Sequence, residues 1–388
     1  MIEEPVETGD RTAAIHRAAP VDRDAIGIWV ASRVGVALAA LAGIWMLGDT
    51  PAGQAPSYLS RWNQWDSQLF IDVAQFGYRG YAAHTTGRHL EAFFPGEPIA
   101  LRVVHVITGD WVAAGLLISA VAGAVAMVAL ARLGELEAVD SPGCGSRAVL
   151  YLVLSPYAVF LAAGYSEALF LSVALPSWLA ARRGRWLAAG LLAGAAGLIR
   201  IDGAFLGVAL IVQWATQAGA ERRWRDLPPL AAPFVVTAGY FAYLDHVTGD
   251  WLAWSHAQAA GWGRHLTAPW TAFHTSWSAA RSPAQGLPYA WSFRAEVLAI
   301  LLGVALTVVL LVMRRWGEAV FVGAQVAALA TSSYYLSVAR STLLWFPLWL
   351  LLARWSLNQR WLHVAYMSVS PALMIVGVIA FTTGHWVG

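Results

Sequence analysis

The chain has 388 residues, of which 58% are hydrophobic and only 12% are charged. This composition is too apolar for an ordinary soluble domain and predicts a protein that lies in lipid. The net charge of +2 is too small for a nucleic-acid partner, and the basic residues, all arginines, are scattered over short loops. Cys144 is the only cysteine, which excludes an intramolecular disulfide.

Residues 1–25 carry mixed charges and lack the apolar run of a signal peptide, so we expect a flexible cytoplasmic tail. About eleven apolar stretches follow, near the spanning length of about 17–25 residues, some of them shorter. Because an unpaired backbone amide is costly in hydrocarbon, the stretches are expected to be helices. The predicted fold class is all-α, a single polytopic membrane domain over residues 26–388. The stretches lie near residues 26–47, 111–133, 147–163, 166–181, 186–200, 203–219, 229–248, 293–313, 317–337, 341–354 and 361–383.

The placement of arginine predicts how these helices are oriented. Many arginines fall in alternate, short loops, which the positive-inside rule assigns to the cytoplasm. They are Arg132, Arg147, Arg182, Arg183, Arg185, Arg222, Arg223, Arg225, Arg314, Arg315, Arg354 and Arg360. This assignment puts the two long loops, 48–110 and 249–292, outside the cytoplasm. Three short segments, 164–166, 200–203 and 338–341, are expected on the same outer side.

Tryptophan is concentrated in the two long outer loops. The second loop carries Trp251, Trp254, Trp262, Trp270 and Trp277. An aromatic belt at the membrane interface explains any single one of them. The functional alternative is a set of aromatic faces that stack on a sugar.

The first outer loop contains a candidate catalytic acid. From Tyr58 to Gly77, apolar residues recur at spacings of three and four, which predicts an amphipathic helix lying flat in the interface. On such a helix the carboxylate of Asp66 points with the apolar stripe, where a charge is costly. The alternative is a helix that begins at Asp66, with this side chain capping the amides of the first turn. Asp72 lies near the edge of the stripe and is expected to be solvated.

Several ordered motifs carry a resemblance to a known family. WDSQLFIDVAQFGY, followed by EAFFPGEPIALR and SPYAVFLAAGYSEALFLS, resembles the PIG-V-like mannosyltransferases, which belong to the GT-C class of membrane glycosyltransferases. The likeness continues through ARRGRWLAAGLLAGAAGLIRIDG, GDWLAWSHAQAAGWGRHLTAPW and ARSTLLWFPLWLLLA, and so covers nearly the whole chain after residue 57. The resemblance implies a GT-C fold and a single-displacement transfer of mannose from a polyprenyl-phosphate donor, with Asp66 at the position of the base. PGEP at 95–98 and IRIDG at 199–203 depart from the family's usual runs, which leaves the roles of Glu97 and Asp202 open.

The expected chemistry needs one base and a counter-charge. A sugar phosphate already carries a good leaving group, so Asp66 alone would accept the proton of the attacking hydroxyl, with inversion. Arginine suits the negative charge that develops on the departing phosphate. Snorkelling to lipid headgroups is the alternative for Arg340, and pairing with Asp202 is the alternative for Arg200. The candidates for binding the donor phosphate are Arg340, as first choice, then Arg264, Arg200 and Arg102.

Other outer-side residues are candidates for contact with substrate. Glu167 either binds a sugar hydroxyl, orients an arginine, or complements a helix dipole with Ser166 as the cap. The histidines lack the spacing of a zinc site, so no metal ligands are predicted, although a loosely held divalent cation is left open. The substrate-binding candidates are Trp65, Ser67, Tyr165, Glu167, His256, Gln258 and Trp262.

The sequence thus predicts a multi-pass enzyme of the plasma (inner) membrane with its active site outside the cytoplasm. Its expected partners are a lipid-linked sugar donor, a glycolipid acceptor and membrane lipids, with no nucleic acid. No cofactor beyond the donor substrate is predicted. Two alternatives stay open: a protein O-glycosyltransferase with the same donor type, and a transporter of lipid or solute. Charges that cluster at one face rather than at the midplane weigh against the transporter.

Overall fold

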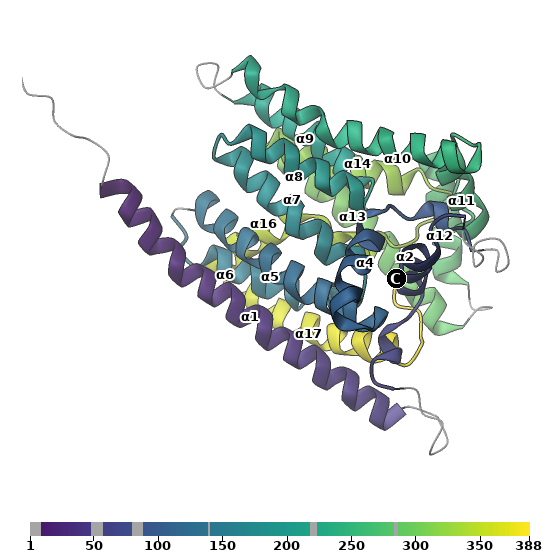
Figure 1. Cartoon of the computed structure of the whole chain (residues 1–388). Coiled ribbons are helices and arrows are strands. Elements are labelled where there is room, and N and C mark those ends of the chain that lie inside the picture. Colours follow the sequence, from purple (N-terminus) through teal and green to yellow (C-terminus); the bar gives the residue numbers. More distant parts are fainter. Residues whose placement is uncertain (1–8, 48–56, 80–87, 139, 218–222, 283–285) are drawn as a thin grey trace, which may run out of the picture.

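The computed structural model describes residues 9–47, 57–79, 88–138, 140–217, 223–282 and 286–388. These residues form an all-α bundle, as predicted. Within them, the only β pairing is a single bridge between Leu266 and Ser332. Figure 1 shows α1 (Gly9–Leu47) and α17 (Arg360–Thr382) running along one edge of the bundle.

Long apolar helices support a multi-pass membrane protein. Among the described residues, five segments are long and apolar enough to cross a bilayer, by length and composition. They are Pro20–Leu47 within α1, Trp111–Glu137 (α5), Trp224–Thr248, which includes α10 (Ala232–Thr248), Leu287–Val312 (α13) and Arg360–Thr382 (α17). The other predicted spans are shorter helices: α6 (Cys144–Val153), α7 (Ser166–Arg182), α8 (Trp186–Ile199), α9 (Asp202–Thr216), α14 (Trp316–Ala330) and α16 (Phe346–Asn358).

Several predicted boundaries differ from those in the structure. The predicted tail, 1–25, is helical from Gly9 onward, and residues 1–8 lie outside the described chain. The predicted helix 147–163 ends at Val153, just before Pro156, because the ring of proline and the restriction it places on the preceding residue disfavour a continuous helix. The predicted helix 317–337 ends at Ala330, and the chain then runs irregularly to α15 (Val338–Ser341).

Glycines on α8 bring two helices close together. A Cβ atom on Gly190 would lie 2.2 Å from the carbonyl oxygen of Pro229, and one on Gly197 would lie 3.0 Å from that of Pro233. Larger side chains at these positions would push α8 away from the start of α10. This close packing fixes α8, whose C-terminal end leads directly to Arg200 and to α9.

Charged residues gather at the two opposite ends of the bundle. In α7, Glu167 lies in the first turn and Arg182 in the last, which separates them by about 22 Å at 1.5 Å per residue. Arg182 Nη1 lies 2.5 Å from Glu137 Oε1, and Arg315 also pairs with Glu137. This end carries arginines that were predicted to face the cytoplasm, whereas Glu167 lies at the other end.

Candidate active site

Asp66 lies directly after a sharp break in the chain. The predicted helix from Tyr58 to Gly77 is instead a 3-10 turn, Ser60–Trp62, followed by α2, Asp66–Phe76. Trp65, between them, has φ of 46°, a region that large side chains rarely adopt. Its ring packs edge-on against Phe381 and Trp386, each at 5.3 Å between ring centroids, and these contacts hold the strained residue in place.

The carboxylate of Asp66 forms an ion pair instead of a helix cap. The helix does begin at Asp66, as the alternative interpretation required, but the cap position is Trp65 and has no side-chain hydrogen bond. Arg340 Nη1 lies 2.9 Å from Asp66 Oδ2. The guanidinium of Arg340 also lies 5.0 Å from the ring centroid of Phe160. Arg340 is therefore buried beside Asp66, so the snorkelling alternative is wrong.

A row of ion pairs with alternating charges extends from this pair. Arg340 Nε and Arg200 Nη1 each lie 3.1 Å from Glu167 Oε1. Arg200 Nε lies 2.9 Å from Asp202 Oδ2, which is the pairing that the sequence left open. Three carboxylates thus alternate with two guanidinium groups, so this row of ion pairs has more negative than positive groups.

Glu296 positions the short helix that carries Arg340. Its carboxylate oxygens accept hydrogen bonds from the backbone amides of Ser337, Val338 and Ala339, at 2.9, 2.7 and 3.1 Å. An acidic side chain at a helix N-terminus complements the exposed amides there. Sequence reasoning missed Glu296, although an acid inside the long apolar helix α13 was the available signal.

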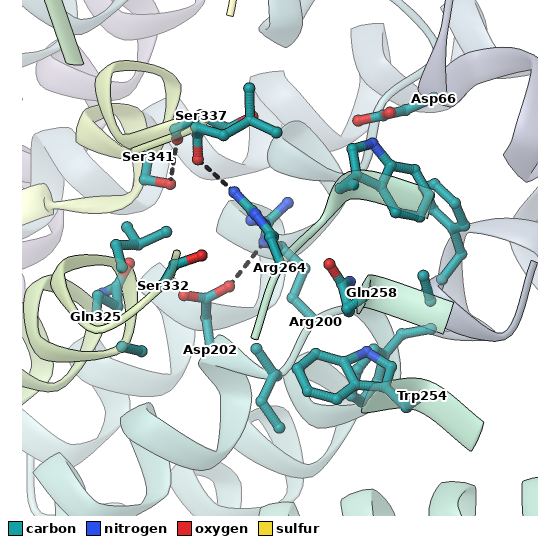
Figure 2. A pocket seen from close by; sticks show the side chains of 18 of the residues that line it. Asp66, Arg200, Asp202, Trp254, Gln258, Arg264, Gln325, Ser332, Ser337 and Ser341 are labelled. Carbon is teal, nitrogen blue, oxygen red and sulfur yellow. Dashed lines mark hydrogen bonds and ion pairs between the residues drawn. The ribbon is translucent and has the colours of Figure 1, made fainter. Parts of the chain in front are cut away.

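The charged residues border a cavity of about 390 Å³ (Figure 2). Asp66, Arg200, Arg264 and Arg340 all line it, together with aromatic side chains such as Phe93. The cavity is large enough for the polar head of a substrate, and its lining combines apolar and aromatic walls with many charged and polar side chains, which suits a polar ligand.

Arg264 differs from the other two arginines of the cavity. It donates a hydrogen bond to the backbone carbonyl of Leu336, and its Nε has no hydrogen-bond partner. In the part of the chain that the structure describes, it forms no ion pair with a carboxylate. Burial lowers the pKa of Arg264, and the charge of Arg340 lowers it further. A guanidinium held in this way is suited to bind an anion.

Comparison with known proteins finds relatives over part of the chain. A family model for mannosyltransferase (PIG-V) matches residues 52–213. The chain resembles the PIG-V mannosyltransferases over residues 52–213, which are called the PIG-V-like segment below. GPI alpha-1,6-mannosyltransferase 2 of Rattus norvegicus is 36% identical over 151 residues, and that of Homo sapiens is 36% identical over 147 residues. The rat alignment covers 36% of this chain and 29% of the rat protein, and the human alignment covers 35% and 28%.

The PIG-V-like segment contains only part of the site. It includes Asp66, Glu167 and Arg200, whereas Arg264 and Arg340 lie beyond residue 213. The three short segments predicted to lie outside, 164–166, 200–203 and 338–341, do meet here, since each contributes a residue to the cavity. Among the described residues, no group of three or more His, Cys, Asp or Glu side chains is arranged to hold a metal ion.

The remaining predicted residues differ in where they lie relative to the cavity. Gln258 and Trp262 line the cavity. Ser67, Tyr165 and Glu167 lie just behind its wall: Tyr165 donates a hydrogen bond to the carbonyl of Gln64 at 3.0 Å, and Ser67 is buried against Gly164. Trp65 packs on aromatic side chains and supports the start of α2.

Arg102 and His256 are not among the cavity-lining residues. Arg102 lies in α4 (Gly96–Thr108) and donates hydrogen bonds to the carbonyls of Ala74 and Val73, so it stabilises the end of α2. His256, in α11 (Ala253–Trp262), is exposed, and its Nδ1 lies 2.6 Å from Asp250 Oδ2. Neither side chain is placed to contact a ligand in the cavity, which corrects the prediction for both.

Glu97 is buried close to the row of ion pairs but is not part of it. Neither of its carboxylate oxygens has a hydrogen-bond partner. Burial, and to a smaller extent the charge of Glu167, raises the pKa of Glu97 well above its ordinary value of 4.5. Burial therefore favours the neutral form of the Glu97 carboxyl.

Proposed function

We propose that this protein is an inverting glycosyltransferase that moves mannose from a polyprenyl-phosphate donor to a hydroxyl group of a glycolipid. One observation carries the proposal: a carboxylate, Asp66, and a guanidinium without a carboxylate partner among the described residues, Arg264, line one cavity at the end of a membrane bundle. The family model and the curated relatives support the mannosyltransferase class.

The proposed reaction assigns one step to each group. Asp66 takes the proton of the acceptor hydroxyl as its oxygen attacks the anomeric carbon of mannose. The bond from that carbon to the phosphate oxygen breaks, and the phosphate leaves with the electron pair. Arg264 stabilises the charge on the departing phosphate. Arg340, which already contacts two carboxylates, holds the Asp66 carboxylate in position.

We further propose that the cavity faces away from the cytoplasm. Ion pairs of Arg182 and Arg315 lie at the opposite end of the bundle from Glu167. By the positive-inside rule, the arginine-rich end is the cytoplasmic one. A polyprenyl chain would then remain in the bilayer while its phosphate reaches the cavity.

The test is transfer by the purified full chain in lipid vesicles. Radiolabelled polyprenyl-phosphate mannose is supplied with membrane acceptors, and the label is followed into lipid extract and into protein. Label in a larger glycolipid supports the proposal, whereas label in protein supports a protein O-glycosyltransferase with the same donor. Uptake of the donor into the vesicles without any covalent product would support a transporter and reject the enzyme.

A further inference from the structure

The cavity has a second polar region, distant from Asp66. Gln325, Ser332 and Asp202 line it, and Figure 2 shows these three side chains across the cavity from Asp66. They come from α14, from the irregular chain after it, and from the first turn of α9. The reaction proposed above gives Gln325 and Ser332 no role.

Gln325 has a buried carbonyl group that is not satisfied. Its side chain is 1% exposed, its Nε2 donates to the backbone carbonyl of Phe321 at 3.1 Å, and its Oε1 has no hydrogen-bond partner. A buried polar atom without a partner is costly, and in a native structure it calls for an explanation. Because Gln325 lines the cavity, a ligand is the natural partner for this oxygen.

Ser332 carries a second unsatisfied group in the same cavity. Its Oγ is buried and has no hydrogen-bond partner. Its backbone is held firmly, since Ser332 pairs with Leu266 in a β bridge and Thr267 N donates to the carbonyl of Thr331 at 2.7 Å. This bridge ties Ser332 to the segment that carries Arg264, so the two groups keep a fixed relation to one another.

The chemistry of these groups selects a sugar ring over a phosphate. Gln325 Oε1 is an acceptor and requires a ligand that donates a hydrogen bond, as a hydroxyl does. Asp202 pairs with Arg200 through Oδ2, and its carboxylate disfavours a second anion beside it. A sugar hydroxyl both donates and accepts, so it matches the amide, the hydroxyl and the carboxylate together.

We propose that Gln325, Ser332 and Asp202 bind the hydroxyl groups of a sugar and so determine which sugar the protein accepts. This inference rests on the proposed function, because it assigns a ligand to the same cavity. The hydroxyls belong either to the transferred mannose of the donor or to the glycan of the acceptor. The chemistry is the same in both cases, and the experiment separates them.

The variants for the test are Gln325→Met and Ser332→Ala in the full chain. Methionine keeps the length of glutamine and removes the carbonyl, so the fold is expected to be at least as stable without ligand. Ser368→Ala is the control, because Ser368 is exposed on α17 and its hydroxyl donates only to the carbonyl of Val364 in its own helix. Thermal unfolding of each variant checks that the fold is intact.

Initial rates are measured with the donor and the acceptor varied separately. A rise in KM of about ten-fold for the donor in both variants assigns the hydroxyls to the transferred mannose. Donor analogues that each lack one hydroxyl should then bind the wild type more weakly than the natural donor does. The analogue that lacks the hydroxyl bound by Gln325 should bind Gln325→Met as tightly as the natural donor does. The same rise for the acceptor alone assigns the hydroxyls to the acceptor glycan. Unchanged KM values for both substrates would overturn the inference.

A binding measurement keeps the inference testable even if the wild type transfers no sugar. Mannose 1-phosphate, methyl α-mannoside and inorganic phosphate are compared by the thermal stabilisation that each gives. Stabilisation by the two sugars should fall in Gln325→Met, while stabilisation by phosphate stays as in the wild type. An inactive wild type would reject the proposed function. This inference alone would be rejected if both sugars stabilised the wild type and Gln325→Met equally and if, where transfer occurs, the KM values were unchanged.

Discussion

Arg340 and Asp66 are 274 residues apart in the chain, yet Arg340 Nη1 lies 2.9 Å from Asp66 Oδ2. The pair joins the PIG-V-like segment, residues 52–213, to a part of the chain beyond it. Because of this pair, the arginines of the cavity have different roles. Arg340 is engaged with carboxylates, so Arg264 replaces it as our first choice for binding the donor phosphate.

Arg340→Met should destabilise the fold. It leaves the buried Glu167 and the half-buried Asp66 without this partner, and breaking a buried pair typically costs about 3–5 kcal/mol. Thermal unfolding in detergent or nanodiscs measures the loss. The control is Arg88→Met, because Arg88 is 37% exposed where it pairs with Asp72 and such pairs contribute about 1 kcal/mol or less. A stability equal to that of the wild type in Arg340→Met would contradict the structural role given to the pair.

Arg264→Gln should weaken binding of the donor and spare the fold. No carboxylate partner of Arg264 is left unpaired in the described residues, so the melting temperature is expected to change little. Loss of a charge-assisted contact to phosphate is expected to raise the donor KM by about ten-fold to a hundred-fold. Arg281→Gln is the control, since Arg281 lies at the end of α12 (Pro269–Arg281), outside the cavity lining. A donor KM that stays at the wild-type value in Arg264→Gln would reject this residue as the phosphate ligand.

Glu97→Gln should remove a pH-dependent loss of stability. Glu97 lies in α4, which is not among the five spanning segments, and burial raises its pKa in the folded state well above 4.5. The unfolded chain ionises this group near pH 4.5, whereas burial favours its neutral form in the folded chain. The contribution of Glu97 to the free energy of unfolding is therefore fully present below pH 4.5 and is lost as pH rises toward the folded pKa.

The difference in unfolding free energy between Glu97→Gln and the wild type should therefore be smallest below pH 4.5 and should grow as pH rises toward the folded pKa of Glu97. Its slope is limited to about 1.4 kcal/mol per pH unit. Denaturant unfolding across this range measures the difference. A difference that shrinks as the pH rises would mean that the Glu97 carboxylate is stabilised in the folded protein.

The sequence predicted those parts of the site that depend on local pattern. Helical spacing identified Asp66 as an acid on an apolar face, and alternating arginine-rich loops predicted which short segments lie together. The break at Trp65 could not be read from the same spacing, because contacts with Phe381 and Trp386 hold the residue in an unfavourable backbone conformation. Tertiary packing overrides local pattern in such cases.

The roles of the individual arginines were harder to predict than their location. Sequence position put Arg340 and Arg264 on the same side, but their partners come from distant helices. Glu167 forms an ion pair with Arg340. Glu296 accepts hydrogen bonds from the backbone of α15 and forms no ion pair with Arg264, whose side chain lines the cavity. Gln325 was missed because a single polar residue in an apolar helix carries no periodic signal.

The most direct test of the account is transfer of mannose by Asp66→Asn. In this variant Arg340 keeps its contact with Glu167, so the protein should fold and should still bind the donor with nearly the wild-type KM. The rate of transfer is expected to fall by at least about a hundred-fold, because general base catalysis is lost. Asp72→Asn, on the same helix but outside the cavity lining, should transfer mannose at the wild-type rate. Transfer by Asp66→Asn at a rate close to that of Asp72→Asn would contradict the assignment of Asp66 as the base.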